Sequence, residues 1–297
     1  MKTLLDWLLI RYPDTPRTRA KQWIMAGRVS VGGVVIRQPH MEMPDPGAAL
    51  VLLDRDAVSL DCGPKGLPIH DQVTLLHLDG ALAVVNKAAG ILSVPAPEGD
   101  ISALEILAAA LPSLPAPYRR LQPMEVHRID CQTSGLLCMA MNRSARAHLI
   151  EQVRTHAMQR EYIAFVEGKP QQPRGTWRHW LKWDDAKSRQ TVVAPDTPGA
   201  AESVTHYEVV AEFHGVTKLR LRLETGRRHQ IRVQAAHSGL PLVGDRLYNP
   251  HYRGTFPRQA LHAVSLSLRH PQQRREMTFT APLPKDLCAL ESALRRS

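Results

Sequence analysis

The sequence contains few residues of the kinds that build metal centres, disulfide frameworks or membrane spans. Its 297 residues include four cysteines, and no two of them have the C-x-x-C spacing of a zinc ribbon or redox site. No apolar run approaches the roughly 18 residues of a membrane span. The short run 4–10 contains Asp6 and lacks a small-residue cleavage site, so it is a poor signal peptide. We therefore expect a cytoplasmic protein without a metal site or a cofactor.

Acidic residues are also in deficit. Lys and Arg number 38 against 28 Asp and Glu, which gives a net charge of +10 and a pI near 9.8. A basic surface attracts polyanions, and nucleic acid is the commonest such partner. Hydrophobic residues make up 43% of the chain, enough for a sizeable core in one large domain or two smaller ones. The composition therefore indicates a folded protein, and it fits a nucleic-acid-binding protein no better than a basic protein that binds none.

The beginning of the chain has the pattern of a helix followed by a hairpin. Thr15 is a suitable N-cap, Pro16 suits the first helical position, and Gly27 is a typical helix end. Two short β runs follow, at 29–31 and 34–36, with two glycines between them. A two-glycine connection between β runs is a strong hairpin signal.

The predicted helix carries Arg17, Arg19 and Lys21, and Arg28 lies just past its end. In an isolated helix such a cluster is usually a solvated face. Here the helix leads directly into a glycine-turned hairpin, and the stretch resembles the alpha-L RNA-binding module of a ribosomal small-subunit protein and many RNA-modifying enzymes. The resemblance implies that residues 1–60 form this module and that these four cations contact RNA.

Residues 61–72 are rich in glycine and proline and are predicted to be a linker. The remainder, 73–297, mixes strands and helices at irregular spacing, which favours an α+β domain built on a mixed, largely antiparallel sheet with flanking helices. The segment 111–117, with three prolines, is predicted to be a surface loop. The predicted strands are 81–86, 136–141, 162–166, 205–210, 218–223 and 277–280, and the predicted helices are 144–155 and 229–236.

A polar segment, 127–135, precedes the apolar run 136–141. Loops on a rigid scaffold often carry catalytic groups, and Asp130 in this loop is suited to act as nucleophile, base or metal ligand. An equally reasonable structural reading makes Asp130 a turn cap, with Thr133 and Ser134 satisfying backbone groups. The loop alone does not separate these readings.

Two further segments add candidate residues. Tyr162 begins an apolar strand, where a tyrosine is usually part of the core. Arg228 and Arg232 are four residues apart in the most basic stretch of the chain and are predicted to share one helix face. Such arginines serve either phosphates or a nearby carboxylate, since a close positive charge lowers a carboxyl pKa.

Taken in order, four segments resemble the RluA family of pseudouridine synthases over about residues 80–285. They are Asn86-Lys87-x-x-Gly90, His127-Arg-Ile-Asp130-x-x-Thr-Ser-Gly135, Arg160-x-Tyr162, and Gly226-Arg-Arg-His-Gln-Ile-Arg232. The resemblance implies an RNA-modifying isomerase that needs no cofactor.

Residue by residue, the resemblance implies that Asp130 is the catalytic aspartate, Tyr162 the active-site tyrosine and Arg232 the arginine that pairs with the aspartate. It makes Arg128 a candidate contact to RNA beside the flipped nucleotide. Arg227 and Arg228 are further candidate RNA-binding residues.

Four positions depart from the family pattern. Ile129 replaces Leu, and Ala88 replaces the Pro that commonly follows Lys87. Arg160 stands where Lys is common and keeps the charge. Arg228 replaces a small hydroxyl residue and adds a positive charge, so it is the departure expected to alter the contact with RNA.

The reaction implied by the resemblance breaks the bond from ribose to the base nitrogen, turns the base and rejoins it through carbon 5. RNA is the expected partner, and the combination with an alpha-L module is similar to enzymes acting on large-subunit ribosomal RNA, with transfer RNA as the alternative. A non-catalytic RNA-binding or ribosome-assembly factor would not need Asp130, Tyr162 and Arg232 together. A metal-dependent nuclease would need clustered carboxylates or histidines, which the Asp130 loop lacks.

Overall fold

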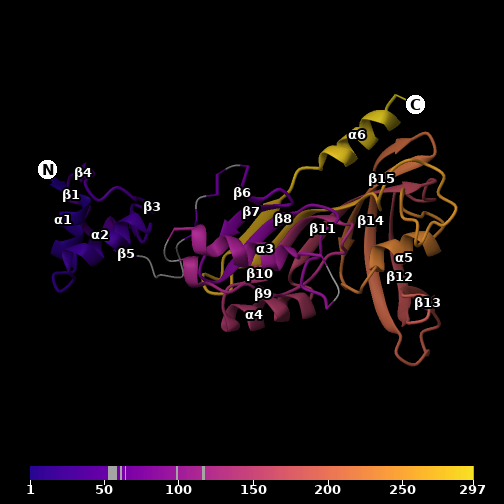
Figure 1. Cartoon of the computed structure of the whole chain (residues 1–297), viewed down its shortest axis with the longest axis horizontal. Helices are drawn as coiled ribbons and strands as arrows, with labels where there is room; N and C mark the ends of the chain where they lie inside the picture. The colour runs from indigo at the N-terminus through magenta and orange to yellow at the C-terminus, as the bar shows by residue number, and fades with distance from the viewer. Residues whose placement is uncertain (53–58, 61, 64, 98–99, 116–117, 297) are drawn as a thin grey trace.

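The computed structural model describes residues 1–52, 59–60, 62–63, 65–97, 100–115 and 118–296 (Figure 1). The chain forms a small N-terminal module followed by a large α+β domain built on one extended sheet. Residues 53–58, next to the predicted domain boundary, and residues 61 and 64 of the predicted linker lie outside the described residues. The elements of the module are β1 (Lys2–Thr3), α1 (Leu4–Arg11), α2 (Arg17–Met25), β2 (Val29–Val31), β3 (Val34–Val35), β4 (Glu42–Met43), η1 (Gly47–Ala49) and β5 (Leu50–Leu52).

The predicted hairpin of the module is confirmed. Strands β2 and β3 pair through Val31 and Val34, and Gly32 and Gly33 between them have φ of 60° and 83°. Two consecutive left-handed residues are what a type I′ turn requires, and glycine adopts them without strain. The predicted helix start is shifted by one residue: Pro16 is the N-cap of α2 and no side chain caps it, so Thr15 does not cap the helix.

Helix α1 was not predicted, because the run 4–10 was considered only as an improbable signal peptide. Thr3 accepts a hydrogen bond from the Asp6 amide and Asp6 accepts one from the Thr3 amide, which is a complete capping box. The leucines of α1 then pack on Ala20 and Ile24 of α2. The apolar run is therefore the core of the module.

The large domain contains a 12-stranded sheet in the order β13-β12-β14-β15-β11-β16-β10-β8-β7-β6, with β17 paired to β16 and β9 to β10. Among the strands of this sheet that the structure describes, β10 and β16 alone pair in parallel, so the largely antiparallel sheet expected from the sequence is confirmed. Its strands are β6 (Leu67–His70), β7 (Val73–Leu78), β8 (Leu82–Lys87), β9 (Met124–Glu125), β10 (Ser134–Ala140), β11 (Gln159–Glu167), β12 (Arg174–Asp184), β13 (Arg189–Val193), β14 (Ala201–Phe213), β15 (Val216–Leu223), β16 (Leu261–Arg269) and β17 (Glu276–Thr280).

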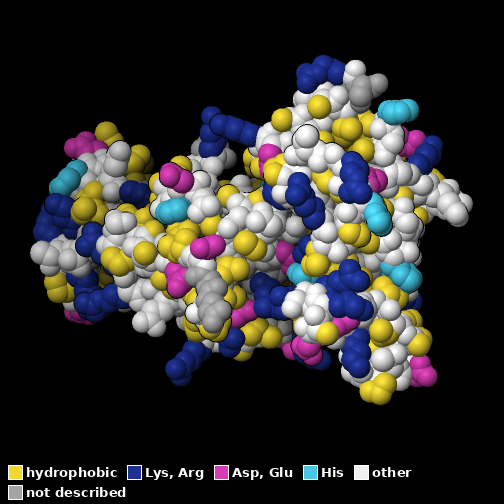
Figure 2. All heavy atoms as spheres, turned by 45° about the vertical axis from the view of Figure 1, so that its right-hand side comes forward, with side chains coloured by type: hydrophobic (Ala, Val, Ile, Leu, Met, Phe, Trp, Pro, Cys, Tyr) yellow, Lys and Arg dark blue, Asp and Glu magenta, His cyan; other side chains and the backbone are white. Residues whose placement is uncertain are grey.

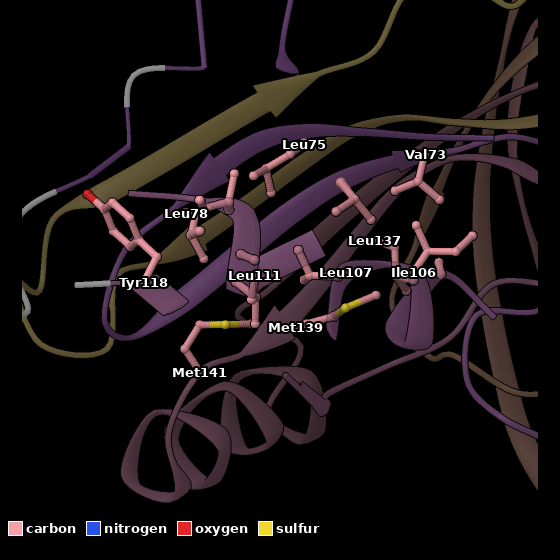
Figure 3. Packing of buried hydrophobic residues seen from close by; sticks show 14 of the residues in the cluster. Val73, Leu75, Leu78, Ile106, Leu107, Leu111, Tyr118, Leu137, Met139 and Met141 are labelled. Carbon is pink, nitrogen blue, oxygen red and sulfur yellow. The ribbon is translucent and has the colours of Figure 1, made fainter. Parts of the chain in front are cut away.

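Strand β10 is buried along its whole length because helices cover both faces of the sheet there. Leu137 and Met139 point to the face covered by α3 (Ala103–Ala110), and Figure 3 shows this packing together with Leu107. Leu136 and Cys138 point to the other face, covered by α4 (Arg143–Arg154). A strand with two buried faces is continuously apolar, as the sequence of β10 is.

Two of the predicted irregular segments belong to the packed domain. In the predicted surface loop 111–117, Leu111 and Leu114 are 1% and 7% exposed and join the core under α3. Within the predicted linker 61–72, residues 67–70 form β6, which pairs with β7. Residues 116–117 of the first segment lie outside the described residues, and the linker prediction was wrong for β6.

The remaining helices are α5 (Gln230–His237) and α6 (Lys285–Leu294). Helix α5 packs on the half of the sheet formed by β11, β15 and β16. The strands predicted at 81–86, 136–141, 162–166, 205–210, 218–223 and 277–280 all lie within or overlap observed strands, and both predicted helices are present within a residue or two. None of the helices in the described ranges combines the length and apolar character needed to cross a bilayer.

Candidate active site

The Asp130 loop enters β10 and is held at its main chain by a buried lysine and a buried serine. Lys87, which is 0% exposed, donates hydrogen bonds from Nζ to the carbonyl oxygens of Ala88, Ile91 and Cys131 at 2.8–3.0 Å. Ser93 Oγ donates to the Ile129 carbonyl and accepts from the Ile129 amide. The loop is therefore fixed on both sides of Asp130.

The far end of the loop is fixed by the segment that leads into β16. Arg258 Nη1 donates to the Gln132 carbonyl at 3.1 Å, and Gln259 donates to Thr133 Oγ1 at 3.3 Å. Gly135 then starts the close parallel pairing of β10 with β16. Its φ is +115°, and a Cβ atom there would lie 2.2 Å from the Ala263 carbonyl oxygen. Glycine is required at this position, so the loop has little freedom to shift.

Arg232 projects from α5 and is shared by two aspartates. Its Nη1 donates to Asp130 at 3.2 Å, while Nε and Nη2 donate to both oxygens of Asp245 at 2.7 and 2.8 Å. The Asp245 side chain is 1% exposed and that of Asp130 is 22% exposed. Burial works against the charge of Arg232, but its hydrogen bonds with Asp245 and the negative charges of both aspartates raise its pKa. Arg232 is thus charged and oriented mainly by Asp245.

The sequence motifs do not assign a role to Asp245. It follows Gly244 in a turn, and the motif around it gives no sign of its partner, because the contact to Arg232 arises only from the tertiary fold. A Cβ at Gly244 would lie 2.0 Å from the Arg258 carbonyl oxygen, and its φ is +77°. The glycine therefore brings this turn against the segment that also fixes the Asp130 loop.

The predicted shared helix face of Arg228 and Arg232 is wrong. Helix α5 begins at Gln230, and the preceding His229 has φ +54°, in the left-handed region. The backbone therefore turns sharply between Arg228 and Arg232. Arg228 points to a neighbouring hairpin, and Arg232 points to the aspartates.

Tyr162 and Arg160 lie two residues apart on β11 and are both 6% exposed. Burial raises the pKa of Tyr162, and the positive charge of Arg160 acts in the opposite direction. The hydroxyl of Tyr162 is therefore protonated at neutral pH.

Asp130 lies at the junction of two adjoining pockets. Arg128, Ile129, Asp130, His229 and Arg232 line both of them. What we call the inner pocket is lined mostly by buried side chains. The lining of the outer pocket is more exposed and includes residues of the segment 92–96. The inner pocket is further lined by Thr133, Arg160, Tyr162, Leu223, Gly226, Arg227, Gln230, Ile231 and Leu261. The three predicted catalytic residues thus line one pocket, and Arg228 joins the outer one.

The hairpin of β12 and β13 contacts Arg228, which lines the outer pocket. The Arg228 guanidinium carbon lies 3.9 Å from the ring centroid of Trp183 on β12. Opposite Trp183 in the strand register, the Gln190 amide donates to Tyr248 Oη at 2.8 Å, and that hydroxyl also contacts His229 Nδ1 at 3.0 Å. Burial lowers the pKa of His229 to about 4, so the ring is neutral at pH 7. We call the Arg228–Trp183 pair the arginine shelf.

Helix α2, on or beside which the predicted cations of the N-terminal module lie, is at the opposite end of the molecule from α5, whose residues line both pockets (Figure 1). Arg19 and Arg28 lie over the Trp23 ring at 5.7 and 5.4 Å, and Lys21 is exposed. Arg17 pairs with Asp6 of α1 at 3.3 Å, so the basic face has an acidic neighbour that the helix sequence does not reveal. Figure 2 shows Lys and Arg side chains on this module and again on the opposite end of the molecule.

Within the described ranges, no group of three or more His, Cys, Asp or Glu side chains is arranged to hold a metal ion. The carboxylates nearest to one another in the site, those of Asp130 and Asp245, both bind Arg232. One cation of the chain itself therefore balances part of their negative charge.

Comparison with known proteins gives one family. The model of a family described as RNA pseudouridylate synthase matches residues 81–237. The chain is 34% identical to an uncharacterized RNA pseudouridine synthase of Bacillus subtilis (strain 168), covering 96% of this chain and 91% of that protein. It is also 34% identical to the ribosomal large subunit pseudouridine synthase D of Xylella fastidiosa (strain Temecula1 / ATCC 700964), covering 96% and 86% respectively.

Solved structures give the same fold. The chain superposes on the human RNA pseudouridylate synthase domain containing 4 protein with a TM-score of 0.62 and 22% identity, covering 74% of this chain and 92% of that one. The shared fold, the family match and the motif order around Asp130 together identify the family of this chain. The chain belongs to the RNA pseudouridylate synthase family, in its RluA branch, and is an enzyme that isomerises uridine in RNA to pseudouridine.

Proposed function

We propose that this enzyme converts a uridine of large-subunit ribosomal RNA to pseudouridine in the cytoplasm, with Asp130, Tyr162 and Arg232 as its catalytic residues. The observation that carries the assignment is the Asp130 carboxylate, held 3.2 Å from Arg232 at the junction of the two pockets. The names of relatives such as the large subunit synthase D of Xylella fastidiosa support the choice of ribosomal RNA.

In this proposal each of the three catalytic residues has a separate role. The Asp130 carboxylate attacks the sugar or removes a ribose proton, and it stabilises positive charge that develops on the ribose. Arg232 keeps that carboxylate ionised and oriented. Tyr162 packs against the base in the inner pocket. The target base has to leave its stack to reach these groups, which costs roughly a few kcal/mol.

Contacts with the surrounding RNA offset that unstacking. We assign them to two surfaces, one at the pocket and one on the N-terminal module, which we place at residues 1–60 ahead of a catalytic domain in 73–297. The arginine shelf supports the first assignment, because a guanidinium stacked on an indole keeps its edge N–H groups free for phosphate. The proposed RNA-binding residues are Arg128, Arg227 and Arg228 at the pocket, and Arg17, Arg19, Lys21 and Arg28 on the module.

The test is to map pseudouridines in total RNA from cells with and without the gene, and then to add purified enzyme to the RNA from the deletion strain. We expect one or a few positions of large-subunit ribosomal RNA to lose the modification and to regain it in vitro. Loss of modification from transfer RNA instead would replace the proposed substrate. Unchanged maps, with the protein still bound to ribosomal RNA, would favour a non-catalytic assembly factor.

A further inference from the structure

Arg160 is a buried cation, and two of its three side-chain nitrogens have no acceptor in the part of the chain that the structure describes. Its residue is 6% exposed, and its Nε and Nη2 atoms are buried with no hydrogen-bond acceptor among the residues that the structure describes. No carboxylate in those ranges forms an ion pair with it. Other buried arginines of the domain are fully engaged: Arg232 binds two aspartates, and Arg258 binds Asp286 and main-chain carbonyls. A buried charge that lacks a partner is strongly destabilising, so the site is incomplete without a ligand.

The fold directs the Arg160 guanidinium into the inner pocket. On β11, Arg160 pairs with Leu223 of β15 on one side and Leu266 of β16 on the other, so its backbone is fixed in the middle of the sheet. A Cβ at Gly226 would lie 2.4 Å from Arg160 Nη1. The glycine of the turn before α5 therefore leaves the room that the guanidinium occupies, and both residues line the pocket with Asp130 and Tyr162.

The position of Arg160 relative to Asp130 indicates which part of a nucleotide it meets. If the ribose lies at Asp130, where the pockets join, the sugar–phosphate chain leaves through the open outer pocket. The base then enters the inner pocket, among Tyr162, Leu223 and Leu261. The only hydrogen-bond acceptors that an unmodified uracil ring offers there are its carbonyl oxygens O2 and O4, since N3 carries a hydrogen.

We propose that Arg160 contacts the substrate by donating hydrogen bonds to a carbonyl oxygen of the target uracil and retains the base while it is detached; this inference rests on the proposed function. In the reaction the C1′–N1 bond breaks and its electron pair stays on the base. The base turns, C5 bonds to C1′, C5 loses its proton and N1 gains one, so the atoms balance. The negative charge of the detached base spreads onto O2 and O4, where a preorganised cation in a pocket lined mostly by buried side chains stabilises it most.

The first test compares Arg160→Met with Arg222→Met, using a synthetic RNA that spans the uridine mapped above. Arg222 lies on β15 beside the partner of Arg160 but is exposed on the other side of the strand. We expect single-turnover rates at saturating RNA to fall about 100-fold in Arg160→Met, as for loss of one transition-state donor. They should be unchanged in Arg222→Met. The melting temperature of Arg160→Met should rise above wild type, because the variant removes an unpaired buried charge.

If Arg160 only stabilises the fold, the melting temperature of Arg160→Met should lie below that of wild type. That result would overturn the proposal. A phosphate contact would also overturn it. In that case the slope of log binding constant against log salt concentration would be smaller in Arg160→Met than in wild type by about 0.7 to 0.9. Contact with a neutral carbonyl leaves that slope at the wild-type value.

The second test places 2-thiouridine or 4-thiouridine at the target position, because sulfur is a weak hydrogen-bond acceptor. With wild-type enzyme, we expect one of the two substitutions to slow the reaction about tenfold, the effect of one lost hydrogen bond of roughly 1.4 kcal/mol. Arg160→Met should show no further slowing with the same RNA. Equal slowing in both enzymes would overturn only the proposed role of Arg160. A wild-type enzyme that converts no uridine would overturn the proposed function as well.

Discussion

Asp130 and Asp245 share one guanidinium, and they do not share it equally. Asp245 takes two short hydrogen bonds from Arg232 and is almost completely buried, while Asp130 takes one longer bond and retains solvent contact. Bidentate charge-assisted bonds fix geometry more strongly than single ones. Asp245 is therefore the residue that orients Arg232, and Asp130 keeps an oxygen available for the substrate.

We expect Asp245→Asn to lower turnover although it leaves Asp130 untouched. The amide keeps the size of the side chain but lacks the charge that aligns Arg232, so Arg232 is free to move toward Asp130. Breaking a buried pair typically costs about 3–5 kcal/mol, and urea unfolding should report a loss of that order. Because Asp245 lies behind Arg232, the dissociation constant for RNA should change little. Full single-turnover activity in this variant would contradict the orienting role.

Lys87 gives the site a pH-dependent stability. Burial lowers the pKa of its amine from 10.5 to about 8, so between these values the unfolded chain binds more protons than the folded one. The free energy of unfolding therefore rises with pH across this window, because the folded protein no longer buries a positive charge once Lys87 is deprotonated. We expect the free energy of unfolding of wild type, measured relative to Lys87→Met, to increase between about pH 7.5 and pH 10.

The Lys87 measurement uses the difference between the two proteins, so the titration of all other groups cancels. A difference that stays constant over the window would mean that the amine titrates normally in the folded state. A comparison variant is Lys65→Met, which removes a lysine near the surface and should leave the pH dependence of wild type in place.

At the scale of elements, half of the strands of the sheet were predicted because they are continuously apolar or alternate: β8, β10, β11, β14, β15 and β17. The strands β6, β7, β9, β12, β13 and β16 were missed. Of these, β12 and β13 form an edge hairpin rich in Arg, Trp and His, in which Trp177 and Leu181 of β12 are the well-buried apolar residues. Helix α1 was missed because its leucines are buried only once α2 folds against them.

The proposed catalytic residues and the pairing of Arg232 with Asp130 were predicted from motifs, but the other partners of Arg232 and Arg228 were not. Asp130, Tyr162 and Arg232 belong to segments with a recognisable order. Asp245 and the arginine shelf depend on how distant segments meet, and the left-handed turn at His229 reversed the predicted relation of Arg228 to Arg232. Spacing along a chain predicts a shared face only where the helix actually continues.

The β12–β13 hairpin carries its own prediction. If the arginine shelf binds phosphate, Trp183→Leu should weaken RNA binding nearly as much as Arg228→Ser, and the double variant should be no worse than Arg228→Ser alone. Non-additivity is expected because Trp183 acts through Arg228. Filter binding to the mapped RNA at several salt concentrations measures both affinity and slope. Arg178→Ser, on the same strand but paired with Glu202, is the control that should bind like wild type.

Additive losses in the Trp183 and Arg228 variants would mean that the indole contacts RNA independently of the arginine. That result would contradict the claim that Trp183 acts through Arg228, but the hairpin would still have a role in RNA binding.

At the scale of the whole molecule, the N-terminal module and the β12–β13 hairpin occupy opposite ends of the long axis, with the pockets in the large domain (Figure 1). A structured RNA held at both ends has more of its phosphates neutralised than one held at the pocket alone. This arrangement separates affinity from chemistry, because the module lies away from Asp130.

We therefore expect conversion of Arg17, Arg19 and Lys21 to Ala to weaken RNA binding without changing the turnover of saturated enzyme. Each lost phosphate contact should reduce the log–log salt slope by about 0.7 to 0.9. The slope is measured by filter binding, and turnover by single-turnover kinetics at saturating RNA. An unchanged slope in the triple variant would show that these side chains form a solvated surface.

The most direct test of the central claim is the amount of pseudouridine formed by Asp130→Asn. The variant keeps the size of the side chain and removes only its charge, so the fold and the RNA dissociation constant should remain close to wild type. We predict no pseudouridine in the mapped ribosomal RNA after prolonged incubation with saturating variant enzyme. Measurable turnover by Asp130→Asn would contradict the assignment of Asp130 as the catalytic residue.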